Sequence, residues 1–372
     1  MTQTDQHTHS LLKTLEALLW NQREVRIFRA IVALFLDCKL RTTLQNIRGI
    51  SASTASRFFS CEHAPDEVFW AELNRWQLGQ FYRLPRRGRR RDVVLKLDLT
   101  CIEKTGKQIP FARVFNRRYG IQLVVLHACV GRLSFPLGYR IYRGKGKATV
   151  TDLALELLAA FPASGWSSRT VVLADAGFGV LDKAAPTGPV RSTEFIQGCQ
   201  ALGFKRLLVG MRCNRQLADG RQLTDLSERG EQVILHDLPT HPLWLSWCDV
   251  KREEGKKRFY VAATFAAAGA YLARRYRRRW LIESFFKSVK HDFGLKEARL
   301  RTHTGIRLWI FLACLAYSFA SLARYRNKQP ITLLEAAQNV LESMTDVQLV
   351  RLMIDCERFS ARCLRRLKLV TV

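Results

Sequence analysis

The 372-residue sequence predicts an α/β fold in which helices pack on a mixed β-sheet, with further helical regions before and after that core. Three observations support this prediction. Residues 92–142 contain three consecutive segments rich in β-branched and aromatic residues, residues 150–213 alternate helical and strand patterns, and both ends of the chain have the apolar spacing of helices. The content of 48% hydrophobic and 25% charged residues is typical of a folded protein and argues against disorder.

The charge balance points to a polyanionic partner. Lysine and arginine number 60 against 32 acidic residues, which leaves a formal net charge of +28. Clustered cations release the counterions condensed on nucleic acid, so we expect double-stranded DNA as the partner rather than a membrane surface. The polar N-terminus MTQTDQHTHS lacks a signal peptide, which predicts a cytoplasmic, nucleoid-associated protein. Ten scattered cysteines without a CxxC pair argue against zinc sites and disulfides.

Residues 1–85 are predicted to form a helical N-terminal DNA-binding domain. Helical spacing runs through LLKTLEALLW and VRIFRAIVALFLDCKL, and Gly49 then separates two short helical patterns in TTLQNIRGISASTASRFFS. Helix, glycine turn and helix fit a helix-turn-helix, but they also describe any small helical bundle, so both interpretations stay open.

A run of arginines, RLPRRGRRR, follows these helices and marks a domain boundary. Proline and glycine interrupt regular structure there, so the charges are expected on an exposed connector. One interpretation is a solvated linker, and the one we favour is a strap along the phosphate backbone of DNA. The residues predicted to bind DNA in this way are Arg86, Arg87, Arg89, Arg90 and Arg91.

The predicted core occupies residues 92–213 and 263–326, and a β-rich insertion at 214–262 separates its two parts. Its strands are expected in VVLKLDLT, YGIQLVVLHACVG, RLSFPLGYRIYRG, TVVLADAGFG and KRLLVGMRC, and its first helices in VTDLALELLAAF and EFIQGCQALGF. The insertion contains short strand patterns in EQVILHDLP, HPLWLSWCDV and KKRFYVAAT. Three strands followed by alternating helices and strands indicate a mixed sheet.

Helical patterns dominate the rest of the chain. The apolar run Leu308–Ala323 has 16 residues and is bracketed by Arg307 and Arg324. Because roughly 20 residues are needed to span a bilayer, we interpret this run as a buried core helix. Residues 327–372 form a predicted helical C-terminal region.

Two aspartates lie at the ends of predicted buried strands. Asp98 is near the end of VVLKLDLT, and Asp175 ends the apolar run of TVVLADAGFG. Acids at the ends of two strands can converge on one edge of a sheet, which is how carboxylates are brought together to hold Mg²⁺ or Mn²⁺. Each aspartate taken alone could equally be a turn former.

A helical segment supplies a third acid and several cations. In YRRRWLIESFFKSVKHDFGL, four polar residues lie on one stripe of a helix, because they are separated by three, four and seven positions. These are Tyr276, Arg279, Glu283 and Lys290, and Lys287 joins the same stripe. On an isolated helix such residues would be exposed ion pairs. Together with two strand-end aspartates, they suit an acidic metal site with cations that grip phosphates.

These motifs resemble the DDE transposases of prokaryotic insertion sequences, and specifically the insertion-sequence-four family. Its helical signature, Tyr, two residues, Arg, three residues, Glu, six residues, Lys, is met in full here. LDLT around Asp98 is similar to its Asp-x-Thr strand end, DAGF around Asp175 to its second motif, and GMR (Gly210, Arg212) to a lesser third motif. The resemblance covers residues 92–325. Some members have arginine after the second aspartate, where this chain has Ala176.

The resemblance implies a ribonuclease-H-like core, in which Asp98, Asp175 and Glu283 are catalytic and hold two Mg²⁺ ions, for which Mn²⁺ can substitute. It also implies cut-and-paste transposition through hairpin ends. The expected partners are the terminal inverted repeats of the element and target DNA, bound by a homodimer. Trp244 and Trp247 are candidates to stack on a displaced base, or else they fill the core of the insertion. A nuclease or resolvase without strand transfer, and a non-catalytic DNA-binding descendant, are the alternative functions.

Overall fold

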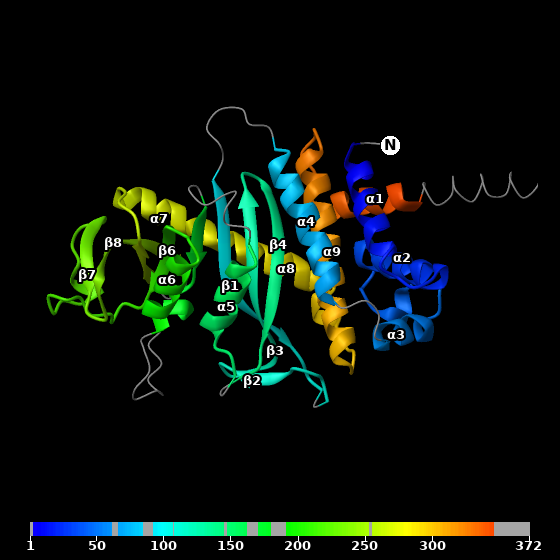
Figure 1. The fold of residues 1–372 in the computed structure, drawn as a ribbon, viewed down its shortest axis with the longest axis horizontal. Helices are drawn as coiled ribbons and strands as arrows, with labels where there is room; N and C mark the ends of the chain where they lie inside the picture. Colours follow the sequence, from blue (N-terminus) through cyan, green and yellow to red (C-terminus); the bar gives the residue numbers. More distant parts are fainter. Residues whose placement is uncertain are drawn as a thin grey trace, which may run out of the picture.

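The computed structural model describes residues 3–61, 66–84, 92–106, 108–144, 147–161, 170–179, 191–252 and 255–345. Its centre is one mixed sheet (Figure 1). The strands are β1 (Val93–Glu103), β2 (Arg113–Phe115), β3 (Arg118–Val130), β4 (Leu133–Tyr142), β5 (Val171–Ala174), β6 (Arg206–Met211), β7 (Glu231–Leu235), β8 (Leu238–Arg252) and β9 (Gly255–Ala263).

The strand order combines antiparallel and parallel pairs. It is β2-β3-β1-β5-β6-β9-β8-β7, with β4 on β3. β1 and β3 pair antiparallel, as do β3 and β4, whereas β1, β5 and β6 run parallel. The parallel pairs need crossovers, and helices provide them. Strands β1, β3, β4, β5 and β6 are those expected from the sequence, whereas the short strand β2 was not expected.

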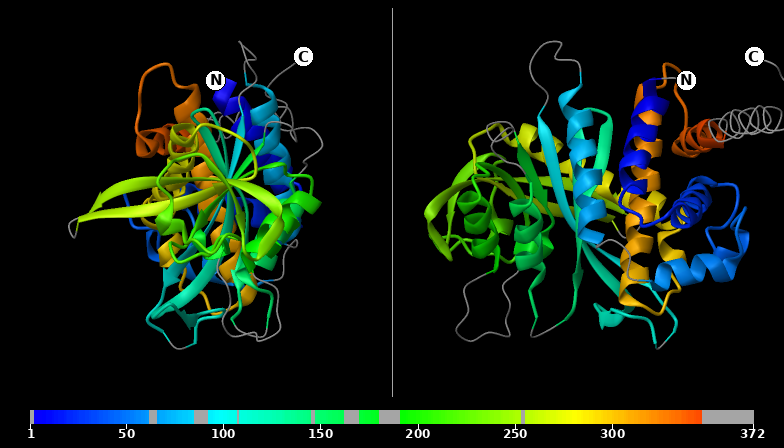
Figure 2. Two further views of the ribbon diagram at one scale, coloured as in Figure 1. Left: turned by 90° about the vertical axis from the view of Figure 1, so that its left-hand side faces the viewer. Right: turned by 45° about the vertical axis from the view of Figure 1, so that its right-hand side comes forward.

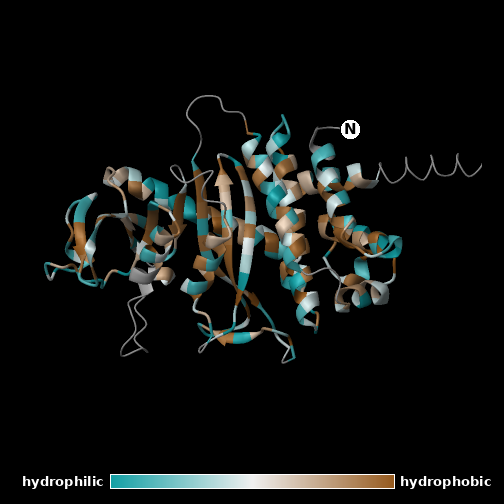
Figure 3. Cartoon of the chain, in the orientation of Figure 1, coloured by the Kyte–Doolittle hydropathy of each residue, from teal (hydrophilic) through white to brown (hydrophobic). Residues whose placement is uncertain are grey.

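Helices cover both faces of this sheet because side chains alternate along each strand. Leu95 and Leu97 of β1 pack with α5 (Val150–Ala159) and α6 (Arg191–Ala201) on one face. Val94 and Leu173 face the other way, toward α7 (Gly269–Arg277). The hydrophobic colouring of the central strands in Figure 3 reflects this burial on both sides.

The β-rich insertion continues the core sheet. Strand β9 pairs antiparallel with β6, and β8 and β7 follow it outward. A long hairpin formed by β8 and β9 projects from the side of the molecule (Figure 2). Residues 214–262 therefore enlarge the sheet that carries the core, because their strands add to its edge.

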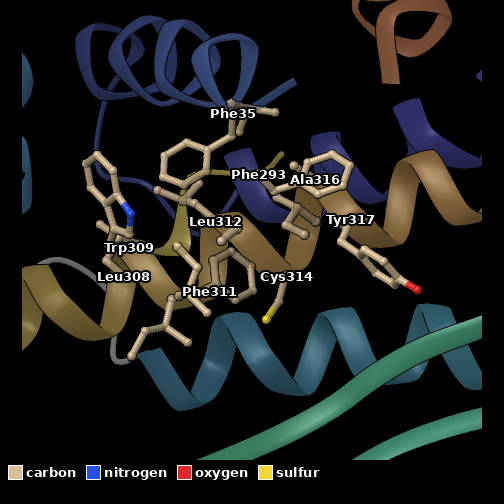
Figure 4. Packing of buried hydrophobic residues seen from close by; sticks show 14 of the residues in the cluster. Phe35, Phe293, Leu308, Trp309, Phe311, Leu312, Cys314, Ala316 and Tyr317 are labelled. Atoms are coloured by element: carbon tan, nitrogen blue, oxygen red, sulfur yellow. The ribbon is translucent and has the colours of Figure 1, made fainter. Parts of the chain in front are cut away.

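The remaining helices form a layer around α9 (His303–Arg326), the run interpreted as a core helix. This helix is long and apolar enough to cross a membrane, but 89% of its most apolar window is buried inside the protein. Around it pack α1 (Gln3–Glu16), α2 (Gln22–Leu36), α3 (Ala52–Ser60), α4 (Asp66–Tyr82) and the helical residues 333–345. Figure 4 shows Phe35 of α2 beside Trp309 of α9, with 4.9 Å between the ring centres.

Of the two short helical patterns on either side of Gly49, the second forms α3, but the first forms only a short 3-10 helix, so these patterns do not give an α-helix on each side of that glycine. Residues 37–51 separate α2 from α3, and they include the short helix η1 (Leu44–Asn46). A helix-turn-helix has a turn of only about three or four residues. Gly49 does adopt a left-handed conformation, with φ of 79°. The helices form part of a bundle whose hydrophobic core they share with α9.

Candidate active site

Strands β1 and β5 place Asp98 and Asp175 side by side. The parallel register pairs Leu97 with Ala174, so the two aspartates are at the next position of each strand. Both aspartates are on the side of their strands that faces α7. Val94 of β1 and Leu173 of β5 are on the same side, and they pack against α7. The polar side chains thus emerge from the apolar face at one edge of the sheet, as the strand-end pattern predicted.

The third acid comes from the helical segment after β9. Helix α7, the short 3-10 helix η5 (Arg278–Trp280) and α8 (Leu281–His291) follow one another without a break. Ile282, Phe285 and Val289 bury one side of α8. That burial fixes the rotation of the helix, so Glu283 is left facing the aspartates while 61% of its side chain stays exposed.

A single guanidinium joins the three carboxylates. Arg279 donates a hydrogen bond of 2.6 Å to Oδ2 of Asp98 and lies 3.6 Å from an oxygen of Asp175 and 3.6 Å from one of Glu283. Only 8% of the Arg279 side chain is exposed. Its Nε has no partner among the described residues. The sequence predicted this arginine as a phosphate ligand, whereas the structure places it inside the acidic cluster.

The electrostatics of the cluster reflect crowding of negative charge. The pKa of Asp98 is raised to about 7, mainly by burial and further by the charges of Asp175 and Glu283, while the charge of Arg279 opposes this shift. Burial alone would lower the pKa of Arg279, but the neighbouring carboxylates hold it above its usual value. A buried acid among two other acids is stable as an anion only beside a cation.

Tight packing holds the C-terminal end of α7 against the ends of strands β5 and β6. Tyr276 is buried, and its hydroxyl donates a hydrogen bond of 3.4 Å to the carbonyl of Ala174, the residue before Asp175. A Cβ on Gly210 of β6 would lie 2.4 Å from that hydroxyl and 2.6 Å from the backbone nitrogen of Ala176. Glycine is therefore required at 210, which gives a structural reason for the Gly-Met-Arg motif.

The residues fit a divalent metal in their chemistry. Carboxylate oxygens are the ligands that Mg²⁺ and Mn²⁺ prefer, and three such groups converge here on one positive charge. Within the described ranges, however, no group of three His, Cys, Asp or Glu side chains is close enough together to hold an ion. The guanidinium of Arg279 is the shared cation of the three acids in this arrangement.

The two lysines of the stripe lie farther along α8. Lys287 is exposed. Burial lowers the pKa of Lys290, whose charged neighbours are Glu103 and Arg118. At 1.5 Å per residue, Lys290 lies about 10 Å along the helix from Glu283. Both lysines therefore extend from the acidic cluster toward the strand pair β1 and β3.

The other predicted DNA-binding residues are not part of this cluster. Trp247 is buried, and the guanidinium groups of Arg229 and Arg258 lie 5.3 and 4.8 Å from its ring centre. Trp244 is half-buried against the core of the same strands. Both tryptophans thus contribute to packing. The connector arginines Arg86, Arg87, Arg89, Arg90 and Arg91 lie outside the described residues.

The comparisons with known proteins agree with this geometry. A family model described as a transposase DDE domain matches residues 89–319, which is more than half of the chain. A solved structure, the piggyBac transposase synaptic complex with hairpin DNA, has the same fold with a TM-score of 0.51 at 11% sequence identity. The match covers 90% of this chain and 73% of that one. No curated protein sequence matches the chain.

Proposed function

Because this chain belongs to the transposase DDE-domain family, we propose that it is the transposase of an insertion sequence, which cleaves the ends of its element and joins them to target DNA. The observation that carries this proposal is the convergence of Asp98, Asp175 and Glu283 on one buried cation. The signature of Tyr276, Arg279, Glu283 and Lys290 favours the insertion-sequence-four family within that class.

The three acids would hold two divalent ions, Mg²⁺ or Mn²⁺. Such ions supply an activated water or 3′-hydroxyl and stabilise the leaving oxygen of an in-line phosphoryl transfer. Burial of Asp98 and the fixed register of Asp175 hold two of the carboxylates in place. Glu283 is the most exposed of the three, so its carboxylate is the most accessible to an entering duplex.

The cations on α8 would position the DNA strand. We propose that Lys287 and Lys290 bind phosphates beside the scissile bond and that Tyr276 supports Asp175 through the carbonyl of Ala174. The phenol of Tyr276 is buried, and burial raises its pKa above the usual value, so it acts as a neutral hydrogen-bond donor. A covalent protein intermediate is not required.

We further propose cut-and-paste transposition through hairpin ends, carried out by a homodimer that brings the two terminal repeats together. The solved structure of similar fold is a synaptic complex with hairpin DNA, which supports this proposal. The reaction would take place in the cytoplasm, on the nucleoid. Because Trp247 is buried, stacking on a displaced base would require the insertion to open.

Incubation with labelled duplexes taken from both flanks of the gene, in Mg²⁺ or Mn²⁺ with a plasmid target, tests the proposal. A transposase cuts at the terminal repeat, forms a hairpin and transfers the end into the plasmid. Cleavage without joined product would indicate a nuclease or resolvase instead. Binding without any cleavage would indicate a non-catalytic descendant.

A further inference from the structure

The hairpin of β2 and β3 forms an exposed arm at the edge of the sheet. It ends in a two-residue turn, Asn116 and Arg117, at the lower edge of the view in Figure 1. Phe115, the last residue of β2 before the turn, makes ring contact with Tyr142 of β4, at 5.1 Å between ring centres, and so holds the tip of the hairpin in place. None of the motifs in the active-site signature includes this arm.

The turn carries a residue that a purely structural role would not favour. Asn116 has φ of 49° and Arg117 has φ of 63°. Two positive φ values are characteristic of the type I′ hairpin turn, for which Asn-Gly is strongly preferred because glycine avoids the clash of Cβ. The asparagine is present here, but arginine occupies the glycine position. Backbone strain of this kind clusters at active sites and ligand-binding segments.

The surface of the arm is cationic with an apolar patch. Arg113, Arg117 and Arg118 are all exposed. Arg118 is 3.4 Å from the exposed carboxylate of Glu103. Between them Val114 is 72% exposed, one of the most exposed large hydrophobic residues in the described part of the chain. A polyanion with apolar sugar edges would match both the charges and the valine.

The arm lies at a defined separation from the acidic cluster. Asp98 pairs with Val125 of β3, and Arg118 is seven residues before Val125 on the same strand. At about 3.3 Å per residue this places the turn roughly 23 Å from Asp98. Lys290, at the far end of α8, has Glu103 and Arg118 as charged neighbours, so α8 and β3 lead away from the cluster in the same direction.

On the basis of the proposed function, we propose that the hairpin of β2 and β3 is a DNA-binding arm that contacts the duplex about seven base pairs from the scissile phosphate. The spacing follows from the roughly 23 Å separation and the 3.4 Å rise per base pair. Arg113 and Arg117 bind backbone phosphates, and Val114 lies against the sugar edge. Lys287 and Lys290 of α8 contact the phosphates in between.

Replacing Arg117 with glycine separates charge from structure. Arg117→Gly removes the cation and also relieves the turn, so the melting temperature should stay the same or rise. Affinity for a 40-base-pair duplex from the gene flank should fall about three- to tenfold, and the salt slope of binding should fall by about one unit. Fluorescence anisotropy at several salt concentrations measures both. Unchanged affinity and slope in Arg117→Gly would overturn the proposal.

Arg132→Ala is the matched control. Arg132 is also an exposed arginine in a hairpin turn, at the opposite end of β3, between β3 and β4. Its removal changes the net charge by the same amount, so it should leave the affinity and the salt slope close to those of the unaltered protein. An equal loss in both variants would mean that only overall charge matters, and it too would refute the arm.

Hydroxyl-radical footprinting locates the contact. Unaltered protein should protect a backbone position about seven base pairs from the cleavage site, and Arg113→Ala/Arg117→Gly should lose that protection alone. Duplexes shortened on the element side or on the flanking side show which DNA the arm holds. A variant that cuts DNA and keeps both the affinity and the protected position of the unaltered protein refutes the arm but leaves the proposed function intact. Protection that depends on the arm residues, in a protein that does not cut DNA, would support the arm but refute the proposed function.

Discussion

At the scale of single residues, Arg279 is the feature that the geometry defines most sharply. It is nearly buried and contacts all three acids of the site. A cation in this position offsets the repulsion among carboxylates that would otherwise be held close together. In the proposed function, divalent ions would do the same with higher charge, so Arg279 and a metal ion would compete for the same three side chains.

The three acids should each be indispensable for cleavage. Asp98→Asn, Asp175→Asn and Glu283→Gln keep the size of each side chain but remove a proposed ligand of the metal ions, which would stabilise the charge of the transition state by several kcal/mol. We expect about a thousandfold loss of nicking rate or more, which corresponds to roughly 4 kcal/mol. DNA binding in a band-shift assay should be largely retained.

Glu156→Gln serves as the control for these variants. Glu156 is an exposed acid on α5, paired with Arg140 at 3.0 Å on the face of the sheet away from α8. Its loss should leave nicking unaltered. If any of the three cluster variants nicked DNA as fast as Glu156→Gln does, that residue would have to be removed from the catalytic set.

Arg279 should affect metal binding in a way that is visible without DNA. Arg279→Ala leaves Asp98 buried without its cation, so the metal-free protein should lose about 3–5 kcal/mol of stability. Mn²⁺ should then raise the melting temperature of the variant more than that of the unaltered protein, because the competing guanidinium is gone. Differential scanning fluorimetry over a Mn²⁺ titration measures both effects. An equal or smaller rise in the variant would argue against competition.

At the scale of elements, the site depends on how closely α7 approaches the ends of β5 and β6. Gly210 allows this approach, because any Cβ there would collide with Tyr276 and with the backbone that follows Asp175. The arrangement couples the helix that carries Glu283 to the strand that carries Asp175. Packing at the C-terminal end of α7 therefore controls the separation of Asp175 and Glu283, two of the proposed catalytic residues.

Gly210→Ala should destabilise the protein by about 1–3 kcal/mol, the usual cost of overpacking, and should also slow cleavage. Chemical denaturation and a nicking assay give the two numbers. Gly79→Ala provides the comparison, since Gly79 lies in α4, where a Cβ would meet nothing within 4 Å and alanine is the better helix former. That control should be neutral or slightly stabilising. Comparable stability in both variants would contradict the close approach described above.

At the scale of the whole molecule, one sheet and one surrounding helical layer form a continuous structure. The N-terminal helices share a hydrophobic cluster with α8, α9 and the strands β1 and β3. His127 lies in this interior, 4.8 Å from the ring of Phe285 on α8. Burial, and then the charge of Lys96, lower the pKa of His127 well below its usual value. Its Nε2 has no partner among the described residues.

This buried histidine should make stability depend on pH. Below about pH 6.5 the unfolded chain binds a proton at His127 that the folded protein excludes, so stability falls as the pH falls. His127→Leu should remove this contribution, and the variant should lose less stability than the unaltered protein between pH 7 and pH 5. Urea denaturation at both pH values tests this. Identical pH dependence in the two proteins would show that the pKa of His127 does not differ between the folded and unfolded states.

The local features of this protein follow from its sequence alone. Periodicity distinguished the strands β1, β3, β4, β5 and β6 from the helices, because alternate burial on a strand and burial of one helix side leave different patterns. Spacing also placed Tyr276, Arg279 and Glu283 on one stripe, and the excess of arginine and lysine indicated DNA.

How these features meet depends on the tertiary fold. The register of β1 and β5 sets Asp98 beside Asp175, and the rotation of the helical segment from α7 to α8 turns Arg279 into the acidic cluster, away from the exposed position that its residue type suggests. The β7–β9 strands extend the core sheet, and the N-terminal helices wrap α9. Such contacts join residues far apart in the chain, and local periodicity carries no information about which distant side chain will neutralise a buried charge.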